Sequence, residues 1–222
     1  MIPTKRPSIR LSRRAVWSGL CLLLAGCATA AQSPLSVGQK GSDRYASIYG
    51  PTMDGSHEIP ALELGEVDHN LLRQQVAFPG RYTPGTIVVN VSERRLYLVE
   101  PRGRALRYAV GVGREKAMNF RGSATVARKA EWPRWIPTAD MIKRIPRYAA
   151  YAKGMPGGLG NPLGARALYL YVGNRDTCFR IHGTNEPTTI GSAVSSGCIR
   201  LFNQDIIDLY SRVSLGAPVI VL

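Results

Sequence analysis

The sequence predicts one mainly β domain of ordinary globular composition. Its 222 residues include 23 glycines and 15 prolines, which are typical of a chain with many turns. Hydrophobic residues make up 45% and charged residues 20%, a balance that argues against wholesale disorder and against several membrane spans. From residue 86 onward, short runs of β-branched and aromatic residues alternate with turn residues, as strands do. The length suits a single main domain.

Strands are expected along most of the second half of the chain. Residues 86–91 and 95–99 predict a hairpin, because both runs are rich in β-branched and aromatic residues. Further strands are predicted over residues 107–112, 124–128, 167–172, 177–182 and 218–222.

One helix and one long connection complete this domain. Residues 203–213 predict a helix, because apolar residues recur on one face and Asn203 can cap the N-terminus. Residues 131–164 are too long for an ordinary connection between strands, so they predict a functional flap. Within the flap, Trp132 and Trp135 either shape its surface, stack on glycan or anchor the core.

The first 26 residues have the layout of a secretory signal peptide. Five basic residues and no acidic residue come first, and an apolar run over residues 15–26 follows. That run is too short to span a bilayer as a helix. Arg13 and Arg14 also weakly resemble a twin-arginine signal. The sequence therefore predicts export out of the cytoplasm.

The end of this leader resembles a bacterial lipobox. It reads Leu24-Ala25-Gly26-Cys27, and in a lipobox the cysteine is lipidated and becomes the new N-terminus. Two or more acyl chains give stable membrane anchoring. We expect a periplasmic protein anchored through Cys27, with Ala28 favouring the outer over the inner membrane. An unlipidated signal peptide is the alternative.

The exported part of the chain is basic. Without residues 1–26, 24 basic and 15 acidic residues remain, a net charge of +9. Such a surface attracts acidic wall polymers or lipid headgroups, although it equally serves solubility. We expect no nucleic-acid partner, because no recognition motif is present. The sequence leaves the oligomeric state unknown.

Four segments are expected along the chain. After the signal peptide of residues 1–26, the Ser-, Gly-, Ala- and Gln-rich residues 27–58 predict a flexible tether. Residues 59–85 predict an N-terminal extension that packs on the domain of residues 86–222. Within the extension, residues 66–76 have near-helical apolar spacing. His57 and His69 are expected to be solvated.

One cysteine and one histidine stand out as candidate catalytic groups. Cys198 lies in the segment Ser195-Ser196-Gly197-Cys198-Ile199-Arg200-Leu201, and His182 opens the segment His182-Gly183-Thr184-Asn185. A thiol attacks a carbonyl as the thiolate, and an imidazole can take its proton or pair with it as a cation. The N–H groups of Gly197 and Cys198 could form an oxyanion hole. By themselves, a lone cysteine is most often a buried hydrophobe and a lone histidine a polar core residue.

These segments together resemble the L,D-transpeptidase catalytic domain (YkuD) family, and within it the ErfK/YbiS-like lipoproteins. The resemblance runs from about Thr86 to Leu222. Its most specific parts are the His-Gly-Thr of residues 182–184 and the Ser-x-Gly-Cys of residues 195–198. It implies a mixed β-sandwich or barrel-like body with a flap over the catalytic groove. It also implies an enzyme without a cofactor or metal.

The resemblance implies a cysteine acyl-transfer reaction on peptidoglycan tetrapeptide stems. Cys198 would be the nucleophile, His182 the base, and the Gly183 carbonyl the group that orients the imidazole. The stem would form a thioester and pass to diaminopimelate of a neighbouring stem, to a lysine of a wall-attached outer-membrane protein, or to water. Ser195, Ser196 and Gly197 would contact substrate or the oxyanion. Arg200 would organise the pocket or meet a substrate carboxylate, with a structural salt bridge as the alternative.

Two points depart from the simplest interpretation. Some family members carry a histidine two places before the nucleophile, where this chain has Ser196, so His182 must act as base alone. If residues 177–182 form a strand, Cys178, Arg180 and His182 share one face. Cys178 is then inert, forms a disulfide with Cys198, or joins Cys198 and His182 in a zinc site. No paired-cysteine spacing supports the zinc site.

Three other functions compete with the transpeptidase. An L,D-carboxypeptidase would use water as the acceptor. A catalytically silent peptidoglycan-binding lipoprotein would use the same groove without chemistry, but the intact Cys, His and Arg set argues against it. A papain-like peptidase is disfavoured because the cysteine follows the histidine.

Overall fold

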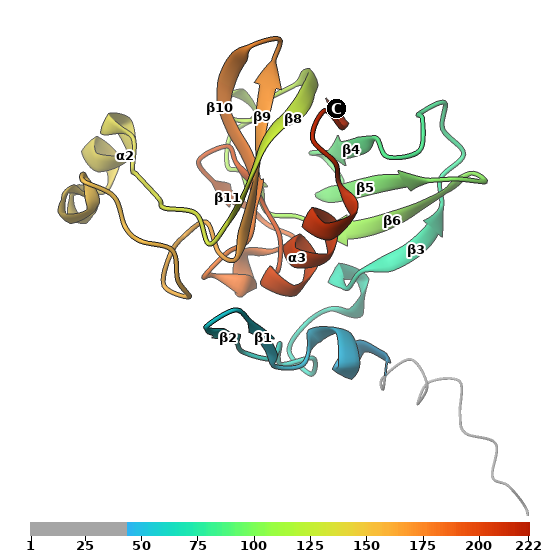
Figure 1. Ribbon diagram of the computed structural model, residues 1–222, viewed down its shortest axis with the longest axis horizontal. Coiled ribbons are helices and arrows are strands. Elements are labelled where there is room, and N and C mark those ends of the chain that lie inside the picture. The colour runs from blue at the N-terminus through green and yellow to red at the C-terminus, as the bar shows by residue number, and fades with distance from the viewer. Residues whose placement is uncertain (1–43) are drawn as a thin grey trace, which may run out of the picture. The chain divides into compact units, whose positions relative to one another are not determined.

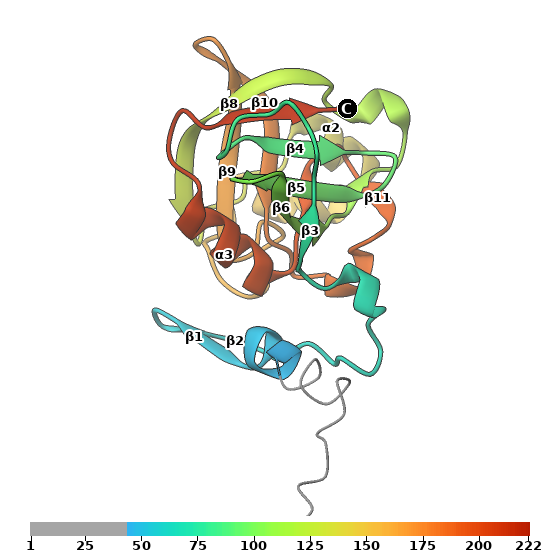
Figure 2. The same cartoon turned by 90° about the vertical axis from the view of Figure 1, so that its right-hand side faces the viewer.

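A nine-stranded mixed sheet forms the body of the protein, for which a computed structural model describes residues 44–222 (Figures 1 and 2). The strand order is β12-β10-β9-β8-β13-β4-β5-β6-β3. Helices are few and short, so the predicted mainly β fold class is confirmed. In residues 44–222, no helix is long and apolar enough to cross a membrane.

Every strand expected from residue 86 onward is present in this sheet. Neighbouring strands run antiparallel, except for the parallel pairs β13–β4 and β10–β12. The strands are β3 (Gln74–Ala77), β4 (Ile87–Asn90), β5 (Arg95–Glu100), β6 (Arg104–Ala109), β8 (Gly122–Glu131), β9 (Arg166–Val172), β10 (Arg175–His182), β12 (Ile199–Arg200) and β13 (Pro218–Val221).

The sheet bends around a single large core. Strands β8–β10 and strands β3–β6 run in different directions, and helix α3 (Asn203–Arg212) lies between the two groups (Figure 1). Ile206 and Leu209 of α3 are fully buried with side chains from both groups of strands. Burying such side chains contributes about 1.5–3 kcal/mol each. This packing fixes the end of β10 and the start of β12, where the candidate catalytic residues lie.

The helix of residues 203–213 exists, but Asn203 is not its cap. Phe202 occupies the N-cap position without a side-chain hydrogen bond to the helix. The Asn203 side chain instead accepts from the Ala165 N–H (3.0 Å) and donates to the Thr184 carbonyl (2.9 Å). It joins the end of the flap to the loop after His182. These long-range hydrogen bonds take the place of a capping bond, and the local sequence does not reveal them.

A small parallel pair positions the loop before Cys198. Strand β7 (Val112–Gly113) pairs with β11 (Ala193–Ser195), so the loop is anchored to the body just before the nucleophile. The 3-10 turns η2 (Lys116–Met118) and η4 (Pro187–Thr189) lie next to these strands in the chain.

Residues 131–164 form a long excursion from the sheet between β8 and β9, as predicted. Helix α2 (Ala139–Arg144) and the 3-10 helix η3 (Pro146–Tyr151) lie at its outer end, away from the sheet (Figure 1). Trp135 is 7% exposed and contacts Tyr148 edge-to-face at a centroid distance of 5.0 Å. Trp135 therefore anchors the interior of the flap.

The predicted tether of residues 27–58 is wrong over its last part. Residues 44–49 are helical, and the hairpin β1 (Thr52–Asp54) and β2 (His57–Ile59) follows. Tyr49 is fully buried, and its hydroxyl donates to Asp205 Oδ1 at 2.9 Å. Polar composition suggested disorder, but burial of one aromatic ring holds the segment in place. The rest of the predicted tether and the leader lie outside the described residues.

The amphipathic helix expected over residues 66–76 is also wrong. A 3-10 turn, η1 (His69–Leu71), is followed directly by strand β3, which pairs with β6 at the sheet edge. Leu72 is buried beside Tyr49 and Phe202. The apolar spacing fits both a helix and a turn followed by a strand, and the open edge of β6 decides in favour of the strand. The extension nevertheless packs on the domain as predicted.

Candidate active site

His182 ends strand β10 and is held by backbone on one side. Its exposed fraction is 4%, and its Nδ1 lies 2.6 Å from the Gly183 carbonyl. A carbonyl only accepts hydrogen bonds, so Nδ1 carries the proton and Nε2 has the free lone pair. This is the contact that the family resemblance implied for Gly183. A side chain at Gly183 would collide with Asn203, which explains the glycine.

Cys198 lies at the end of a tight loop just before β12. Ser195 Oγ donates to the Cys198 carbonyl at 2.7 Å and accepts from the Gly197 N–H at 3.1 Å. Gly197 has φ of 121° and packs against the Met118 carbonyl, so a Cβ there would be both strained and blocked. These bonds fix the backbone on which the thiol stands.

The same loop changes the interpretation of Gly197 and Ser195. Because the Gly197 N–H is bonded to Ser195 Oγ, it is not a free oxyanion donor in this arrangement. Ser195 is 3% exposed and is engaged in the loop. Its side chain shapes the nucleophile turn, whereas exposed Ser196 remains a candidate for substrate contact.

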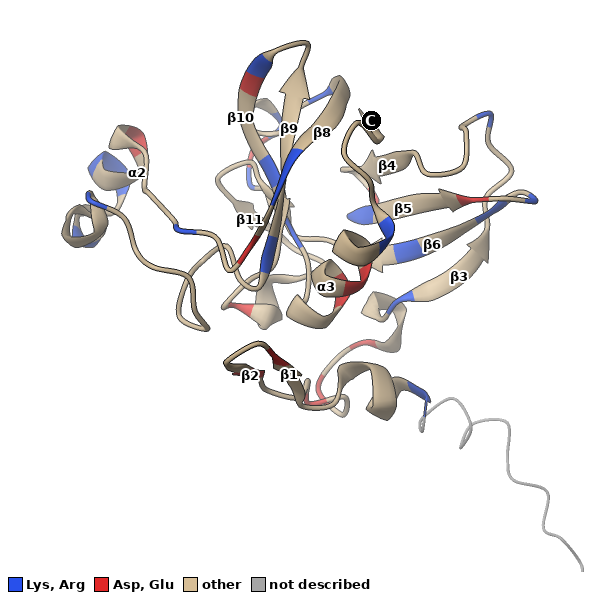
Figure 3. Cartoon of the chain, in the orientation of Figure 1, with Lys and Arg blue, Asp and Glu red and all other residues tan. Residues whose placement is uncertain are grey.

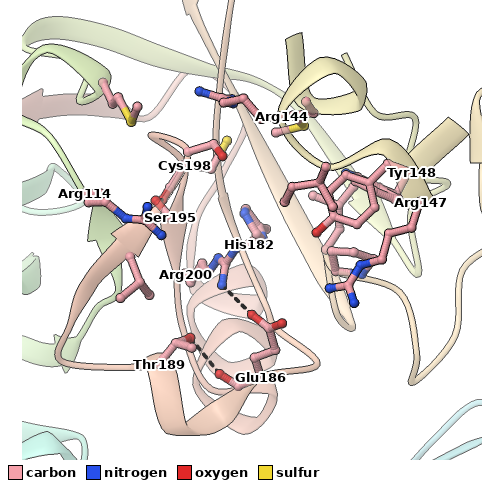
Figure 4. A pocket seen from close by; sticks show the side chains of 18 residues that line it. Arg114, Arg144, Arg147, Tyr148, His182, Glu186, Thr189, Ser195, Cys198 and Arg200 are labelled. Atoms are coloured by element: carbon pink, nitrogen blue, oxygen red, sulfur yellow. Dashed lines mark hydrogen bonds and ion pairs between the residues drawn. The ribbon is translucent and has the colours of Figure 1, made fainter. Parts of the chain in front are cut away.

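One cavity of about 550 Å³ brings the candidate residues together. Cys198, His182 and Arg200 face it from the body, and Arg144 and Tyr148 border it from the flap (Figure 4). The Cys198 thiol and the His182 imidazole therefore line the same cavity. A flap side chain above a thiol and an imidazole is suited to excluding water from an acyl transfer.

The cavity is mainly cationic and apolar. Four of its lining residues are arginines and one is a carboxylate: Arg114, Arg144, Arg147, Arg200 and Glu186. Basic residues also occur along the flap around α2 (Figure 3). Such a site attracts ligands that carry carboxylates.

Arg200 lies on β12 next to His182 and forms an ion pair. Its Nη1 is 2.9 Å from Glu186 Oε2, and the exposed fractions of the two side chains are 20% and 56%. The salt bridge expected as the structural alternative is therefore present. Arg200 also lines the cavity, so the two roles are compatible.

Burial keeps both catalytic candidates neutral near pH 7. Burial, assisted by the positive charge of Arg200, lowers the pKa of His182 to about 4, although the Gly183 and Leu163 carbonyls oppose this shift. Burial raises the pKa of the Cys198 thiol, and the Arg180 N–H and charge only partly offset it. The site at rest thus holds a neutral thiol and a neutral imidazole. This favours transfer of the thiol proton to the imidazole during attack over a preformed pair of thiolate and imidazolium.

Cys178 lies at an irregularity in strand β10. Strand β10 has a register shift between Asp176 and Arg180, and Cys178 adopts φ of 63° within it. This bulge interrupts the regular alternation of side chains on which the predicted common face depends. The Cys178 side chain is exposed and both thiols are free. Its carbonyl lies 4.0 Å from Cys198 Sγ. Among residues 44–222 no cluster of metal-binding side chains is found.

Sequence reasoning missed several residues of the site. In the sequence, Asn203 fits a helix cap, and nothing distinguishes the flap residues Arg144, Arg147 and Tyr148 as part of a site. Their approach to the cavity depends on how the flap folds back, for which no local pattern exists. The basic composition of residues 143–147 was the one available signal.

A family model and the curated relatives point to the same family. The family model described as "L,D-transpeptidase catalytic domain" (YkuD) matches residues 84–221. The probable L,D-transpeptidase ErfK/SrfK of Escherichia coli (strain K12) is 38% identical over 66% of this chain and 46% of its own length. The chain thus spans about half the length of the curated relatives it matches.

Two solved structures are also similar. One, named as a probable carnitine operon oxidoreductase from Brucella melitensis, is 52% identical over 72% of this chain and 99% of that chain, with a TM-score of 0.49. The other, L,D-transpeptidase 3 from Mycobacterium tuberculosis, is 20% identical over 62% of this chain and 60% of that chain, with a TM-score of 0.44. Since the family model covers more than half of the sequence, the chain belongs to the L,D-transpeptidase catalytic domain (YkuD) family.

Proposed function

We propose that this protein is a cysteine L,D-transpeptidase that acts on tetrapeptide stems of peptidoglycan. The observation that carries the proposal is the cavity that Cys198 and His182 both line below a flap, in a chain of this family. The cationic lining supports a stem substrate, because diaminopimelate and the terminal D-alanine both present carboxylates.

In the first half of the reaction, Cys198 Sγ attacks the carbonyl between diaminopimelate and D-alanine. The thiol proton moves to His182 Nε2 as the S–C bond forms, and the imidazole then returns it to the departing D-alanine nitrogen. The stem remains as a thioester on Cys198. Because both groups start neutral, no charge has to be buried before the substrate arrives. The Cys198 N–H is the proposed oxyanion donor.

In the second half, an amine resolves the thioester. Neutral His182 takes a proton from the attacking nitrogen, the new amide forms, and the thiol is regenerated. Diaminopimelate of a second stem gives a 3-3 crosslink, and a lysine of an outer-membrane protein gives attachment to the wall. Water in the same position gives carboxypeptidation, which is the alternative outcome.

We also propose that the protein works in the periplasm from a lipid anchor on Cys27, in the outer rather than the inner membrane. The support is the lipobox-like Leu24-Ala25-Gly26-Cys27 after a basic and apolar leader. These residues lie outside the described structure. Metabolic labelling with a palmitate analogue tests the anchor, and Cys27→Ala should abolish the label.

A carbapenem should add covalently to Cys198, because the strained β-lactam carbonyl resembles the scissile amide. Intact-mass measurement is expected to show one adduct on the wild type and on Cys178→Ala, which removes the other thiol, and none on Cys198→Ala. An unmodified wild type, or equal adducts on both cysteine variants, would contradict the assigned nucleophile.

The products formed from purified tetrapeptide muropeptides identify the acceptor. Crosslinked dimers support the transpeptidase, and tripeptides alone support the carboxypeptidase. Binding without turnover by wild type and Cys198→Ala alike would show a silent wall-binding protein.

A further inference from the structure

The flap leaves and rejoins the body at adjacent points. The Trp132 N–H donates to the Ala165 carbonyl at 2.8 Å, which closes the excursion at its base. We call residues 132–135 and 155–165 the neck of the flap. Trp132 has φ of 41°, a left-handed conformation that is uncommon for a bulky residue. Such a conformation persists where surrounding contacts hold it.

One carboxylate of the N-terminal hairpin binds both sides of this neck. Asp54, at the end of β1, accepts from Trp132 Nε1 at 2.8 Å on the outgoing side. It also accepts two hydrogen bonds, at 2.6 and 2.7 Å, from the Arg166 guanidinium, directly after the returning side. The Arg166 side chain is 7% exposed, so the pair is a largely buried, bidentate, charge-assisted contact.

A second contact from the hairpin supports the first. The His57 ring of β2 stacks on the Trp132 ring, with centroids 3.9 Å apart and an interplanar angle of 20°. On the other strand of the neck, Gly157 packs so closely on Trp132 that a Cβ there would overlap its carbonyl. The hairpin therefore holds the Trp132 ring, and the neck holds the Trp132 backbone.

The neck passes its position on to the cavity wall. The Asn161 side-chain amide donates to the Pro133 carbonyl at 3.1 Å and to the Pro156 carbonyl at 2.8 Å, which ties both strands of the neck. Trp135 and Met155 exchange backbone hydrogen bonds of 3.0 and 2.7 Å. The Trp135 ring then packs against Tyr148, which borders the cavity opposite Cys198.

We propose that Asp54 is a positioning residue, through which the β1–β2 hairpin sets the neck of the flap and thereby the wall of the catalytic cavity. Asp54 does not line the cavity, and it acts through Trp132 and Arg166. The enzymatic consequence rests on the proposed function, whereas the structural consequence does not.

Asp54→Asn in the full chain tests the proposal, with Glu58→Gln as the matched control. Glu58 lies on the same hairpin and is exposed, so its variant makes the same change of charge away from the neck. Hydrogen–deuterium exchange of peptides spanning residues 132–164 is expected to be about tenfold faster in Asp54→Asn, because charge-assisted bonds are lost. In Glu58→Gln it should stay within about twofold of wild type.

Steady-state turnover of tetrapeptide muropeptides provides the second measurement. A displaced flap wall weakens substrate binding without removing a reacting group, so KM should rise at least about fivefold while kcat stays within about twofold. A purely structural defect would lower the active fraction, and hence kcat, at unchanged KM. Unchanged flap exchange together with unchanged KM in Asp54→Asn would overturn the proposal.

A milder variant protects the test against misfolding. Trp132→Phe keeps a ring for stacking on His57 but removes the Nε1 donor to Asp54, so the same peptides should exchange faster by a smaller factor. If the flap peptides of both Trp132→Phe and Asp54→Asn exchange at the wild-type rate, the role assigned to Asp54 is contradicted. If the wild type turns over no muropeptide, the proposed function fails, and the exchange measurements still decide the role of Asp54.

Discussion

At the scale of single residues, burial decides how the proposed nucleophile and base are charged. His182 and Cys198 both lose hydration, and Arg200 adds a positive charge that further disfavours an imidazolium. A resting ion pair of thiolate and imidazolium would have to overcome both effects. The pocket is therefore arranged for a proton that moves only when a carbonyl carbon is in place.

The pH dependence of carbapenem acylation should reveal this arrangement. Because the pKa of His182 is lowered from 6.5 to about 4, the imidazole stays neutral and able to accept a proton through mildly acidic conditions. The second-order rate should be nearly constant from pH 7 to pH 5 and halve near pH 4. A stopped-flow series with a half-point near 6.5 would show an ordinary histidine and would contradict the buried neutral base.

The residues proposed to carry the chemistry could be singled out because their pattern is local. Cys198, His182 and Gly183 lie in two short segments whose resemblance to the family implies acyl transfer. Asn203 and Asp54 were not predictable in their observed roles. Asn203 bonds to Ala165, 38 positions away, and Asp54 bonds to Arg166, 112 positions away. No periodic pattern in the sequence reveals such distant pairs.

At the scale of elements, strands were predicted well and the N-terminal segment poorly. The β-branched runs of β4, β5 and β9 fit a pleated, buried surface wherever they occur. Residues 44–77 have no such pattern and take their structure from the surface on which they pack. The bulge in β10 was equally hidden, because residues 175–182 look like a regular strand until the register of β9 is known.

Helix α3 carries a carboxyl group with a shifted pKa where this N-terminal segment docks. Asp205 is fully buried beneath Tyr49, and burial raises its pKa to about 7 despite the nearby Arg73. A raised carboxyl pKa means that the folded state holds a proton that the unfolded chain releases above about pH 4. Its contribution to stability is thus complete below pH 4 and is lost as pH rises through 7.

Asp205→Asn should remove this pH dependence. The free energy of unfolding of the variant minus that of wild type should rise from pH 4 to pH 8, by up to roughly 4 kcal/mol, because only the wild type loses stability over this range. Asp208→Asn is the matched control of opposite sign, since bonds from Arg212 and Tyr108 outweigh burial and lower the pKa of Asp208. Urea titrations at several pH values measure both, and parallel curves for the two variants would contradict the assigned shifts.

At the scale of the whole molecule, the folded unit is larger than the segment that the family shares. The match begins at residue 84, whereas Tyr49, Asp54 and Leu72 complete the packing of the body from upstream. Composition and length predict a single main domain, but they do not reveal where its packing begins. That boundary depends on contacts rather than on similarity.

A chain of residues 84–222 should therefore be much less stable than a chain of residues 44–222. The shorter chain exposes Phe202 and Ile190 and leaves Arg166 without its main carboxylate partner. We expect its Tm to be lower by at least about 10 °C, which corresponds to a few kcal/mol for a domain of this size. Calorimetry with equal Tm values for the two chains would show that the upstream segment adds nothing to the fold.

The pairing of Asp54 with Arg166 also constrains how such catalytic units can be exchanged between proteins. A recombination that exchanges only the shared segment would transfer the buried Arg166 guanidinium without the Asp54 carboxylate that neutralises it. Chimeras in which residues 44–83 are transferred together with residues 84–222 should keep the flap in its place over the cavity. Chimeras joined at residue 84 would receive the candidate catalytic residues with a displaced flap.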